Sequence, residues 1–507
     1  MNERRLAVID LGSNSFRLVV FTWVPGGGWW KRTDEIHESV RLGQGLDASG
    51  ALQPQPMERA LETIDLYAHF CRATGITEIR PVATSAIRDA TNRDELINRA
   101  RERSGLVIEV LSREEEARYG FLAVANSTSL TDGVALDIGG GSMQLVHVKD
   151  RRELDAQSWP LGAVRMTERF LPDEKAKASQ IEELREHVRS ELASAPWLAD
   201  AAERGERIAG IGGALRNLAT AAELDERLPS FGVQGFSLKR KELSRLVEEL
   251  ADLPASERGS IPGIKKERGD LILAAAVVIE EVMLIGGFDA IETTEEGLRE
   301  GIFFSVLLED RDPPLFEDVR RESVLNLALQ YHPEPHHTRH VARLALEVWD
   351  ELAQAGVHEG RVDERELLWA AAILHDIGTA IDYDDHHRHS RYLVLSAGLP
   401  GWSQRETVLI AQMVRYHRKG TPSLADFDRL TEDGDDELLL RCSAVLRLAE
   451  QFERARDQAV KAAHIAVDDG NVDLTIEADE DATIARWAAE RTSDVFKRAF
   501  GKELRVS

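Results

Sequence analysis

One pattern occurs twice in the chain and constrains the fold more than any other feature. The segments "LAVIDLGSNSFRLVVF" (residues 6–21) and "VALDIGGGSMQLVHV" (residues 134–148) each contain an apolar strand that ends in an aspartate. In both, a turn of small residues follows the aspartate and a second apolar strand follows the turn. Alternating strands and helices of about 10 to 15 residues surround the two segments, which favours an α/β fold. The duplication predicts two similar α/β halves.

The two turns have the composition of phosphate-binding loops. Glycine tolerates positive φ and lets a ligand approach the backbone closely, and concave arrays of N–H groups attract phosphate oxygens. One such turn is usually only a turn, but two in matching contexts favour a shared phosphate site. Neither turn fits the Walker or the G-x-G-x-x-G pattern, because a strand follows each turn. The predicted phosphate-binding residues here are Gly12, Ser13, Asn14, Gly139, Gly140, Gly141 and Ser142.

The aspartates before the turns, Asp10 and Asp137, are predicted metal ligands. A carboxylate cannot bind phosphate by itself, but it can hold Mg²⁺, directly or through water, and the ion then neutralises phosphate charge. Two turns that face each other would hold one phosphate from both sides.

The length and patterning predict four structural parts. Residues 1–130 and 131–311 are expected to form the two α/β halves, with a helix near 295–308 returning to the first half. The charged, proline-containing segment "EDRDPPLF" (residues 309–316) predicts a linker. Residues 312–463 are almost entirely helical in pattern, and 464–507 predict a small α+β part with a "DG" hairpin turn and one final helix.

Composition narrows the choice of partners and compartment. The formal net charge is −26, which argues against nucleic acid or an anionic membrane as a partner. A polyanionic substrate would therefore need a bound cation and local basic clusters. Cys71 and Cys442 are the only cysteines, so neither a disulfide framework nor a cysteine-based zinc site is expected. With no leader-like N-terminus and no apolar run of about 20 residues, we expect a soluble, cytoplasmic protein.

The paired turns resemble those of the actin and sugar-kinase superfamily, which is built from two RNase H-like halves. Within it, the sequence resembles the Ppx/GppA family of exopolyphosphatases and guanosine pentaphosphate phosphohydrolases through at least the first 305 residues. The motifs that carry the resemblance are collinear: "DLGSNSFRL" from Asp10, "ATSAIRDA" around Arg88, "EEEARYGF" from Glu114, "DIGGGS" from Asp137, "LGAVRMTE" from Leu161, "GIGGALRNLA" from Gly210 and "GLREG" from Gly297.

The resemblance implies Mg²⁺-dependent release of terminal phosphate from inorganic polyphosphate, with Mn²⁺ as an alternative ion. Hydrolysis of the 5′ γ-phosphate of guanosine pentaphosphate (pppGpp) on the same site is the nearest alternative. A non-catalytic sensor of polyphosphate or of guanosine tetraphosphate (ppGpp) is a third reading. "GIGGALRN" resembles the adenosine loop of the superfamily, which suggests an ATP-dependent enzyme as a fourth. A homodimer is implied by the helical extension that family members often carry.

The catalytic base implied by the resemblance is Glu115, the first glutamate of the family's Glu-Glu-Ala-Arg motif. Ser112 and Glu115 also form S-x-x-E at a predicted helix start, and this spacing by itself favours a capping box. Arg88 is implied as a clamp on phosphate, since a guanidinium matches phosphate oxygens. Arg268 and the neighbouring lysines at 265 and 266 are candidates for a basic path or, equally, for solvated charge.

Gln144 departs from the family, which typically has glutamate at this position. Glutamine forms hydrogen bonds but cannot act as a base or as a strong Mg²⁺ ligand. If the glutamate of the family helps to hold metal, this chain must depend more on Asp137 and Asp10.

Residues 312–463 resemble HD-domain phosphohydrolases, in which such residues bind divalent metal. The resemblance implies a second metal site formed by His337, His375 and Asp376, with His417 and Glu450 at further positions of the pattern. Family exopolyphosphatases often carry this helical domain without hydrolase activity. Histidines on helices are also commonly capping or interface residues.

Overall fold

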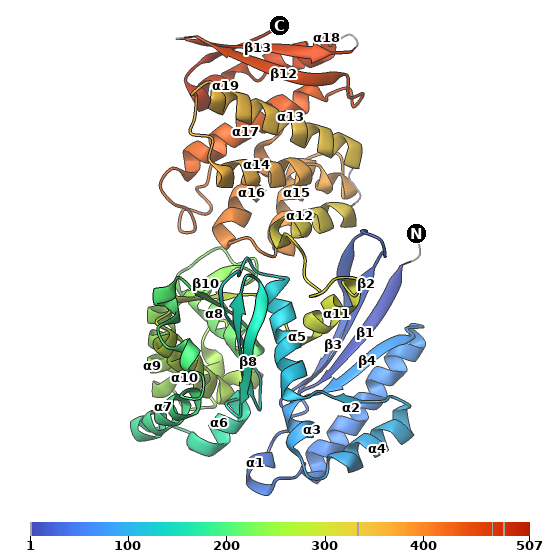
Figure 1. Cartoon of the computed structure of the whole chain (residues 1–507), viewed down its shortest axis with the longest axis vertical. Coiled ribbons are helices and arrows are strands. Elements are labelled where there is room, and N and C mark those ends of the chain that lie inside the picture. The colour runs from blue at the N-terminus through green and yellow to red at the C-terminus, as the bar shows by residue number, and fades with distance from the viewer. Residues whose placement is uncertain (1–2, 332–333, 469, 480–481) are drawn as a thin grey trace. The chain divides into compact units, whose positions relative to one another are not determined.

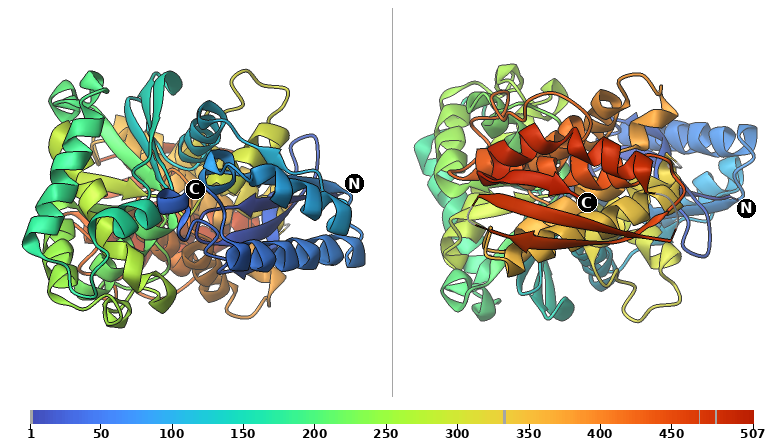
Figure 2. Two further views of the ribbon diagram at one scale, coloured as in Figure 1. Left: turned by 90° about the horizontal axis from the view of Figure 1, so that it is seen from below. Right: turned by 90° about the horizontal axis from the view of Figure 1, so that it is seen from above.

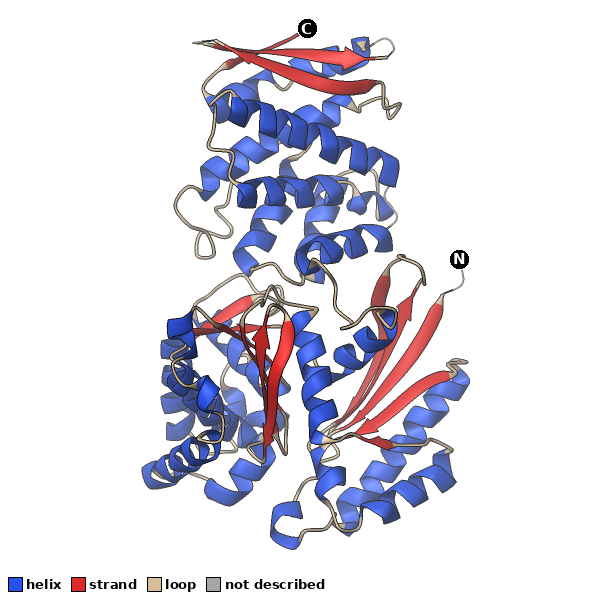
Figure 3. Cartoon of the chain, in the orientation of Figure 1, coloured by secondary structure: helices blue, strands red, loops and turns tan. Residues whose placement is uncertain are grey.

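The computed structural model describes residues 3–331, 334–468, 470–479 and 482–507. The chain divides into two compact units, Met1–Val319 and Arg320–Ser507. The first unit contains two mixed sheets flanked by helices, and the second is mainly helical with one small sheet (Figures 1 and 3).

The first sheet of unit 1 has the strand order β3-β2-β1-β4-β5. Antiparallel pairs join β1 to β2 and β2 to β3, whereas β4 lies parallel to β1 and β5 parallel to β4. The register pairs Asp10 with Arg17 across the first turn. Its strands are β1 (Arg4–Leu11), β2 (Phe16–Trp23), β3 (Trp30–Glu38), β4 (Glu78–Ala83) and β5 (Glu109–Val110).

The second sheet repeats this order as β8-β7-β6-β9-β11, with β10 added beyond β11. Here β6, β7 and β8 form an antiparallel meander, β9 lies parallel to β6, and β11 parallel to β9. The expected duplication of the α/β half is therefore confirmed. The strands are β6 (Gly133–Ile138), β7 (Met143–Lys149), β8 (Arg152–Trp159), β9 (Arg207–Ile211), β10 (Phe236–Lys239) and β11 (Ala290–Thr293).

Helices cover both sheets of unit 1, and Figure 2 (left) shows this unit from below. In the first half they are α1 (Leu46–Ser49), α2 (Pro54–Ala73), α3 (Ser85–Asp89), α4 (Arg93–Ser104) and α5 (Arg113–Ala125). In the second half they are α6 (Ala163–Phe170), α7 (Ala178–Leu192), α8 (Gly213–Asp225), α9 (Arg240–Asp252) and α10 (Gly269–Gly286).

The side chains of β1 alternate between two cores, as a strand buried on both faces requires. Ala7 and Ile9 belong to one core with residues of α2, whereas Leu6 and Val8 belong to another with residues of α11 (Leu298–Leu307). Helix α11 thus returns to the first half from the end of the second. Helix α11 packs so closely on α5 that a Cβ added at Gly301 would overlap the backbone carbonyl of Tyr119.

Unit 2 consists of a helical part and a three-stranded sheet of order β12-β13-β14. The sheet is seen from above in Figure 2 (right). Helix α12 (Val319–Gln330) begins at the boundary between the units, and α13 (Pro335–Gln354), α14 (Val362–Leu374), α15 (His386–Ala397), α16 (Gln404–Tyr416) and α17 (Asp435–Phe452) follow it. The sheet comprises β12 (Val460–Val467), β13 (Asn471–Ala478) and β14 (Glu503–Val506).

The C-terminal end differs from the expected single helix. Two short helices, α18 (Thr483–Glu490) and α19 (Ser493–Phe500), are separated where the Thr492 and Ser493 hydroxyls bond to carbonyls of the preceding turn. Gly501 then adopts a left-handed conformation that ends α19, and β14 adds a parallel strand to β13. The "DG" turn expected between β12 and β13 includes residue 469, which lies outside the described residues.

Both cysteines are buried and free. Among the described residues, no helix is both long and apolar enough to cross a membrane.

Candidate active site

A cleft of about 130 Å³ lies in unit 1, where the turns of the two sheets meet. The turn between β1 and β2 and the turn between β6 and β7 both line it. The predicted residues that line this cleft are Asp10, Gly12, Ser13, Asn14, Asp137, Gly139 and Gly140. Gly141 lines a smaller neighbouring cavity together with Ser13 and Gly140, and Ser142 is buried beside it. The structure thus brings the two expected loops together.

Close packing, rather than backbone conformation, explains the glycines of the second turn. Gly139, Gly140 and Gly141 have no positive φ. A Cβ at Gly140 would come within 3.0 Å of the Ser13 Cβ, in the turn of the other half. The residues are small because two loops from different sheets must touch.

Glu115 lies outside the cleft. Its carboxylate accepts a hydrogen bond of 2.8 Å from the Ser112 backbone N–H, and the Ser112 hydroxyl accepts one of 3.1 Å from the Glu115 N–H. The capping box considered for this pair is therefore present at the start of α5, and Glu115 is exposed.

Glu116, the next residue, is the glutamate that lines the cleft. It is buried, and its two carboxylate oxygens have different partners: Arg88 Nη1 at 2.6 Å and Ser142 Oγ at 3.3 Å. Burial raises the pKa of Glu116, and the positive charge of Arg88 opposes that rise. The buried carboxylate is thus oriented from both halves of the unit.

Arg88 has a different position from the one expected of a phosphate clamp. Its guanidinium donates to Glu116 and to the Leu111 carbonyl, and it is not among the residues that line the cleft. Its contacts are those of a residue that positions Glu116.

Four arginines line the cleft instead: Arg17, Arg216, Arg268 and Arg299. Burial and the positive charges of neighbouring arginines lower the pKa of Arg17 and of Arg268 to about 10, so both remain cationic at neutral pH. Because the chain is acidic overall, a polyanionic ligand requires local positive charge. The four arginines provide that charge in this cleft.

Three of the four arginines come from separate motifs that carried the family resemblance. Arg17 follows the first turn, Arg216 lies on α8 in "GIGGALRN", and Arg299 lies on α11 in "GLREG". Arg268, singled out from the sequence, directly precedes α10. Arg17, Arg216 and Arg299 are not among the site residues predicted from the sequence. The sequence signal that could have identified them is the arginine that stands in each of these three motifs.

The two predicted metal ligands share the cleft with Glu116. Burial and the negative charges of Glu116 and Asp10 raise the pKa of Asp137 to about 7. Burial raises the pKa of Asp10, while Arg299, whose Nη1 lies 2.9 Å from Asp10 Oδ2, acts against it.

This donor set fits a hard divalent cation. Carboxylates held in close mutual repulsion, beside serine and backbone groups, are the oxygen ligands that Mg²⁺ prefers. Gln144 does not contribute: it is buried and donates to the hydroxyls of Ser142 and Ser158. Its contacts hold Ser142, which in turn bonds to Glu116.

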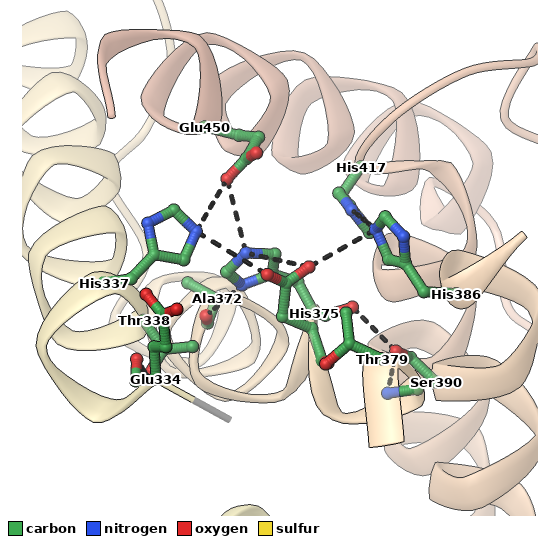
Figure 4. Close-up of polar contacts among 12 residues, drawn as sticks. Glu334, His337, Thr338, Ala372, His375, Thr379, His386, Ser390, His417 and Glu450 are labelled. Carbon is green, nitrogen blue, oxygen red and sulfur yellow. Dashed lines mark hydrogen bonds and ion pairs between the residues drawn. The ribbon is translucent and has the colours of Figure 1, made fainter. Parts of the chain in front are cut away.

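The residues predicted for a second site also come together, in unit 2. His337, His375 and Asp376 are buried, and the His337 and His375 Nε2 atoms lie 3.7 and 3.6 Å from the Asp376 carboxylate. His386, His417 and Glu450 lie beside them and complete a histidine cluster (Figure 4).

The repeated sheet order and the facing loops define a two-lobed, actin-like protein whose cleft suits a phosphorylated ligand. Comparison with protein families agrees: residues 28–310 match the Ppx/GppA phosphatase family, and residues 319–488 match Ppx/GppA phosphatase, domain III. The chain therefore belongs to the Ppx/GppA phosphatase family.

Three solved structures show the same fold over about three fifths of the chain. The Aquifex aeolicus family member is 27% identical over 61% of this chain and 99% of its own, with a TM-score of 0.52. An exopolyphosphatase-like protein is 27% identical over 60% and 97%, with a TM-score of 0.53. An exopolyphosphatase from Cytophaga hutchinsonii shares 24% identity over 60% and 98%, with a TM-score of 0.55. The resemblance of unit 2 to HD-domain phosphohydrolases stays a prediction.

Proposed function

We propose that the protein is an exopolyphosphatase that releases the terminal phosphate of inorganic polyphosphate. The observation that carries this proposal is a cleft lined both by four arginines and by a buried, oriented carboxylate. Family membership supports hydrolysis of a phosphoric anhydride, and the similarity to an exopolyphosphatase-like protein at 27% identity supports polyphosphate as the substrate class.

Glu116 is the proposed general base, in place of Glu115. A water molecule beside its carboxylate would attack the terminal phosphorus while the proton passes to Glu116. The bond from phosphorus to the bridging oxygen then breaks, and that oxygen leaves with the shortened chain. Arg88 and Ser142 hold the carboxylate in one orientation during this step, as a base must be held.

The arginines bind and orient the anion. Terminal phosphate groups carry the charge and the planar spacing of oxygens that guanidinium groups recognise. The backbone N–H groups of the two turns complete the cradle around the terminal phosphoryl group. Arg299 also pairs with Asp10, which links the phosphate site to the carboxylates.

A Mg²⁺ ion is the proposed cofactor, held by Asp137 with Asp10. When bound, it would neutralise phosphate charge and polarise a phosphoryl oxygen. Mn²⁺, which takes similar oxygen ligands, is the alternative ion. A cytoplasmic location and a homodimer stay predictions of the sequence.

Hydrolysis of guanosine pentaphosphate is the second candidate, because the family comprises both activities and the cleft recognises phosphate. The test is phosphate release from long-chain polyphosphate and from guanosine pentaphosphate, each with and without Mg²⁺. Faster Mg²⁺-dependent release from polyphosphate supports the proposal, and faster release from the nucleotide favours the alternative. Binding of either anion without phosphate release indicates a sensor.

A further inference from the structure

The turn between β1 and β2 is held in place by the segment that follows β3. The Arg41 N–H donates a hydrogen bond of 2.7 Å to the Asn14 carbonyl oxygen. The Gly43 N–H donates one of 2.8 Å to the Ser13 carbonyl oxygen. Residues 41–47 therefore support the first phosphate-binding turn from its own half of unit 1.

The turn between β6 and β7 is held in the same way by the start of α6. The Ala163 N–H donates to the Gly139 carbonyl oxygen at 3.0 Å, and the Val164 N–H donates to the Gly140 oxygen at 2.8 Å. Because these bonds come from the first residues of α6, a shift of this helix would carry the second turn with it.

Charged side chains of α6 reach across to the first half, beside α1 (Figure 1). The Arg165 guanidinium lies between two carboxylates: its Nη2 is 2.9 Å from Asp89 Oδ2 at the end of α3, and its Nε is 3.5 Å from Asp47 Oδ1 on α1. Its side chain is only 17% exposed. One turn further along α6, the Glu168 carboxylate accepts a hydrogen bond of 3.1 Å from the Gly45 N–H.

The two turns leave little space for adjustment where these contacts lie. The cavity lined by Ser13, Gly140, Asp47 and Arg165 has a volume of about 10 Å³, which is room for one water molecule at most. Hydrogen bonds between ionised groups are shorter and stronger than those between neutral ones. The contacts of Arg165 therefore fix α6, and with it the second turn, at one position relative to the first turn.

We propose that Arg165 is a positioning residue for the reaction in the cleft, because through Asp47 and Asp89 it holds the two phosphate-binding turns at the spacing that one phosphoryl group requires. The proposal rests on the function proposed for the cleft. Arg165 is not among the residues that line the cleft, so it acts through the turns and not on the substrate.

Steady-state kinetics on polyphosphate separates this role from simple binding. Arg165→Gln should lower kcat by about 10- to 100-fold, since a small misplacement of a reacting group has an effect of this size. KM should change less than about threefold, because the four arginines that bind the anion remain in place. Arg165→Lys keeps one positive charge and should recover most of the lost kcat. A rise in KM with kcat unchanged would overturn the proposal.

A second comparison tests whether Arg165 acts through the two carboxylates. Asp89 also lies 3.6 Å from Arg88, so the comparison is made within the Asp47→Asn/Asp89→Asn protein and not against the parent. Adding Arg165→Gln to that protein should lower kcat no further. An additional loss of tenfold or more would show that Arg165 acts by another route and would overturn the proposal.

The distance between the two halves gives a readout that needs no substrate. Spin labels are attached to Glu62→Cys on α2 and Glu249→Cys on α9, which are exposed positions in different halves, whereas both native cysteines are buried. In the ligand-free protein, double electron–electron resonance should find a wider distribution of distances in Arg165→Gln than in the parent. If the parent releases no phosphate from polyphosphate, the proposed function fails, while these distances still test the contact.

Arg169→Gln is the matched control, because Arg169 lies one turn from Arg165 on α6 and contacts only Phe170 and His187 of the second half. It should leave kcat and the distance distribution unchanged. Circular dichroism checks the folding of each variant. If Arg165→Gln does not fold, the distances in the Asp47→Asn/Asp89→Asn protein decide. A distribution as narrow as that of the parent would overturn the proposal.

Discussion

At the scale of single residues, the adjacent glutamates Glu115 and Glu116 have different positions and contacts. Residues that follow each other in an α-helix point about 100° apart, so only one of them can face a given surface. Glu115 turns back to cap the first turn of α5, whereas Glu116 enters the cleft. The sequence motif locates the pair, but the rotation of α5 selects the member that faces the cleft.

Replacing Glu116 by glutamine should lower kcat by a factor of about 10² to 10⁴, because glutamine cannot accept the proton of the attacking water. Phosphate release from polyphosphate under saturating substrate measures this change. Glu115→Gln is the matched control: glutamine still serves at the third position of a capping box, so kcat should stay within a few-fold of the parent. The reverse ranking of the two variants would assign the base to Glu115.

Arg268 is a second residue whose environment predicts its role. Its side chain makes no hydrogen bond or ion pair with any residue that the structure describes, although it lines the cleft and is half-buried. A half-buried cation without a side-chain partner is suited to a bound anion.

We therefore expect Arg268→Gln to raise KM for polyphosphate about tenfold or more while kcat changes little, since one charge-assisted contact contributes about 1.4 kcal/mol or more. Steady-state kinetics over a range of substrate concentrations separates the two constants. Arg245→Gln, which removes an exposed arginine paired with Asp225, should leave both unchanged. An unchanged KM in the Arg268 variant would count against an anion contact.

At the scale of elements, the position of the Glu116 carboxylate, the proposed general base, depends on the packing of α5 against α11. Gly301 permits this packing, because any side chain there would meet the backbone of Tyr119 on α5. Helix α11 also contributes Arg299 to the cleft. The packing of α5 against α11 therefore positions both Glu116 and Arg299 there.

The substitution Gly301→Ala should lower the free energy of unfolding by about 1–3 kcal/mol, since a methyl group forces two closely packed helices apart. Urea unfolding followed by circular dichroism measures the change. On the same helix, Ser305→Ala removes a half-buried hydroxyl and should cost less than about 1 kcal/mol. Equal midpoints for the two variants would show that the helices tolerate the added methyl.

At the scale of the whole molecule, the chain consists of two compact units, each with its own cluster of polar residues. Unit 1 contains the arginine-lined cleft and unit 2 the histidine cluster. Multi-domain proteins commonly unfold in more than one step, and a ligand stabilises only the unit to which it binds.

Calorimetry of the full chain should therefore show two unfolding transitions. Inorganic tripolyphosphate with Mg²⁺, in the inactive Glu116→Gln protein, should shift one transition upward and leave the other in place. At 100 times its dissociation constant a ligand adds about 2.7 kcal/mol, a shift of several degrees. A single cooperative transition that moves as a whole would contradict independent units.

The sequence by itself determined the duplicated α/β fold, the mainly helical C-terminal part and the two loops around Asp10 and Asp137. These features are encoded locally, in the alternation of strands and in small residues at turns. Only the tertiary structure decided that Glu116 faces the cleft, that Arg88 supports it, and that four arginines from distant segments line the same cleft. For the histidine cluster, the sequence resemblance indicated His337, His375 and Asp376 with His417 and Glu450, and the packing of several helices brings them together. Side-chain direction depends on how each helix is rotated against its neighbours, and contacts between distant segments set that rotation.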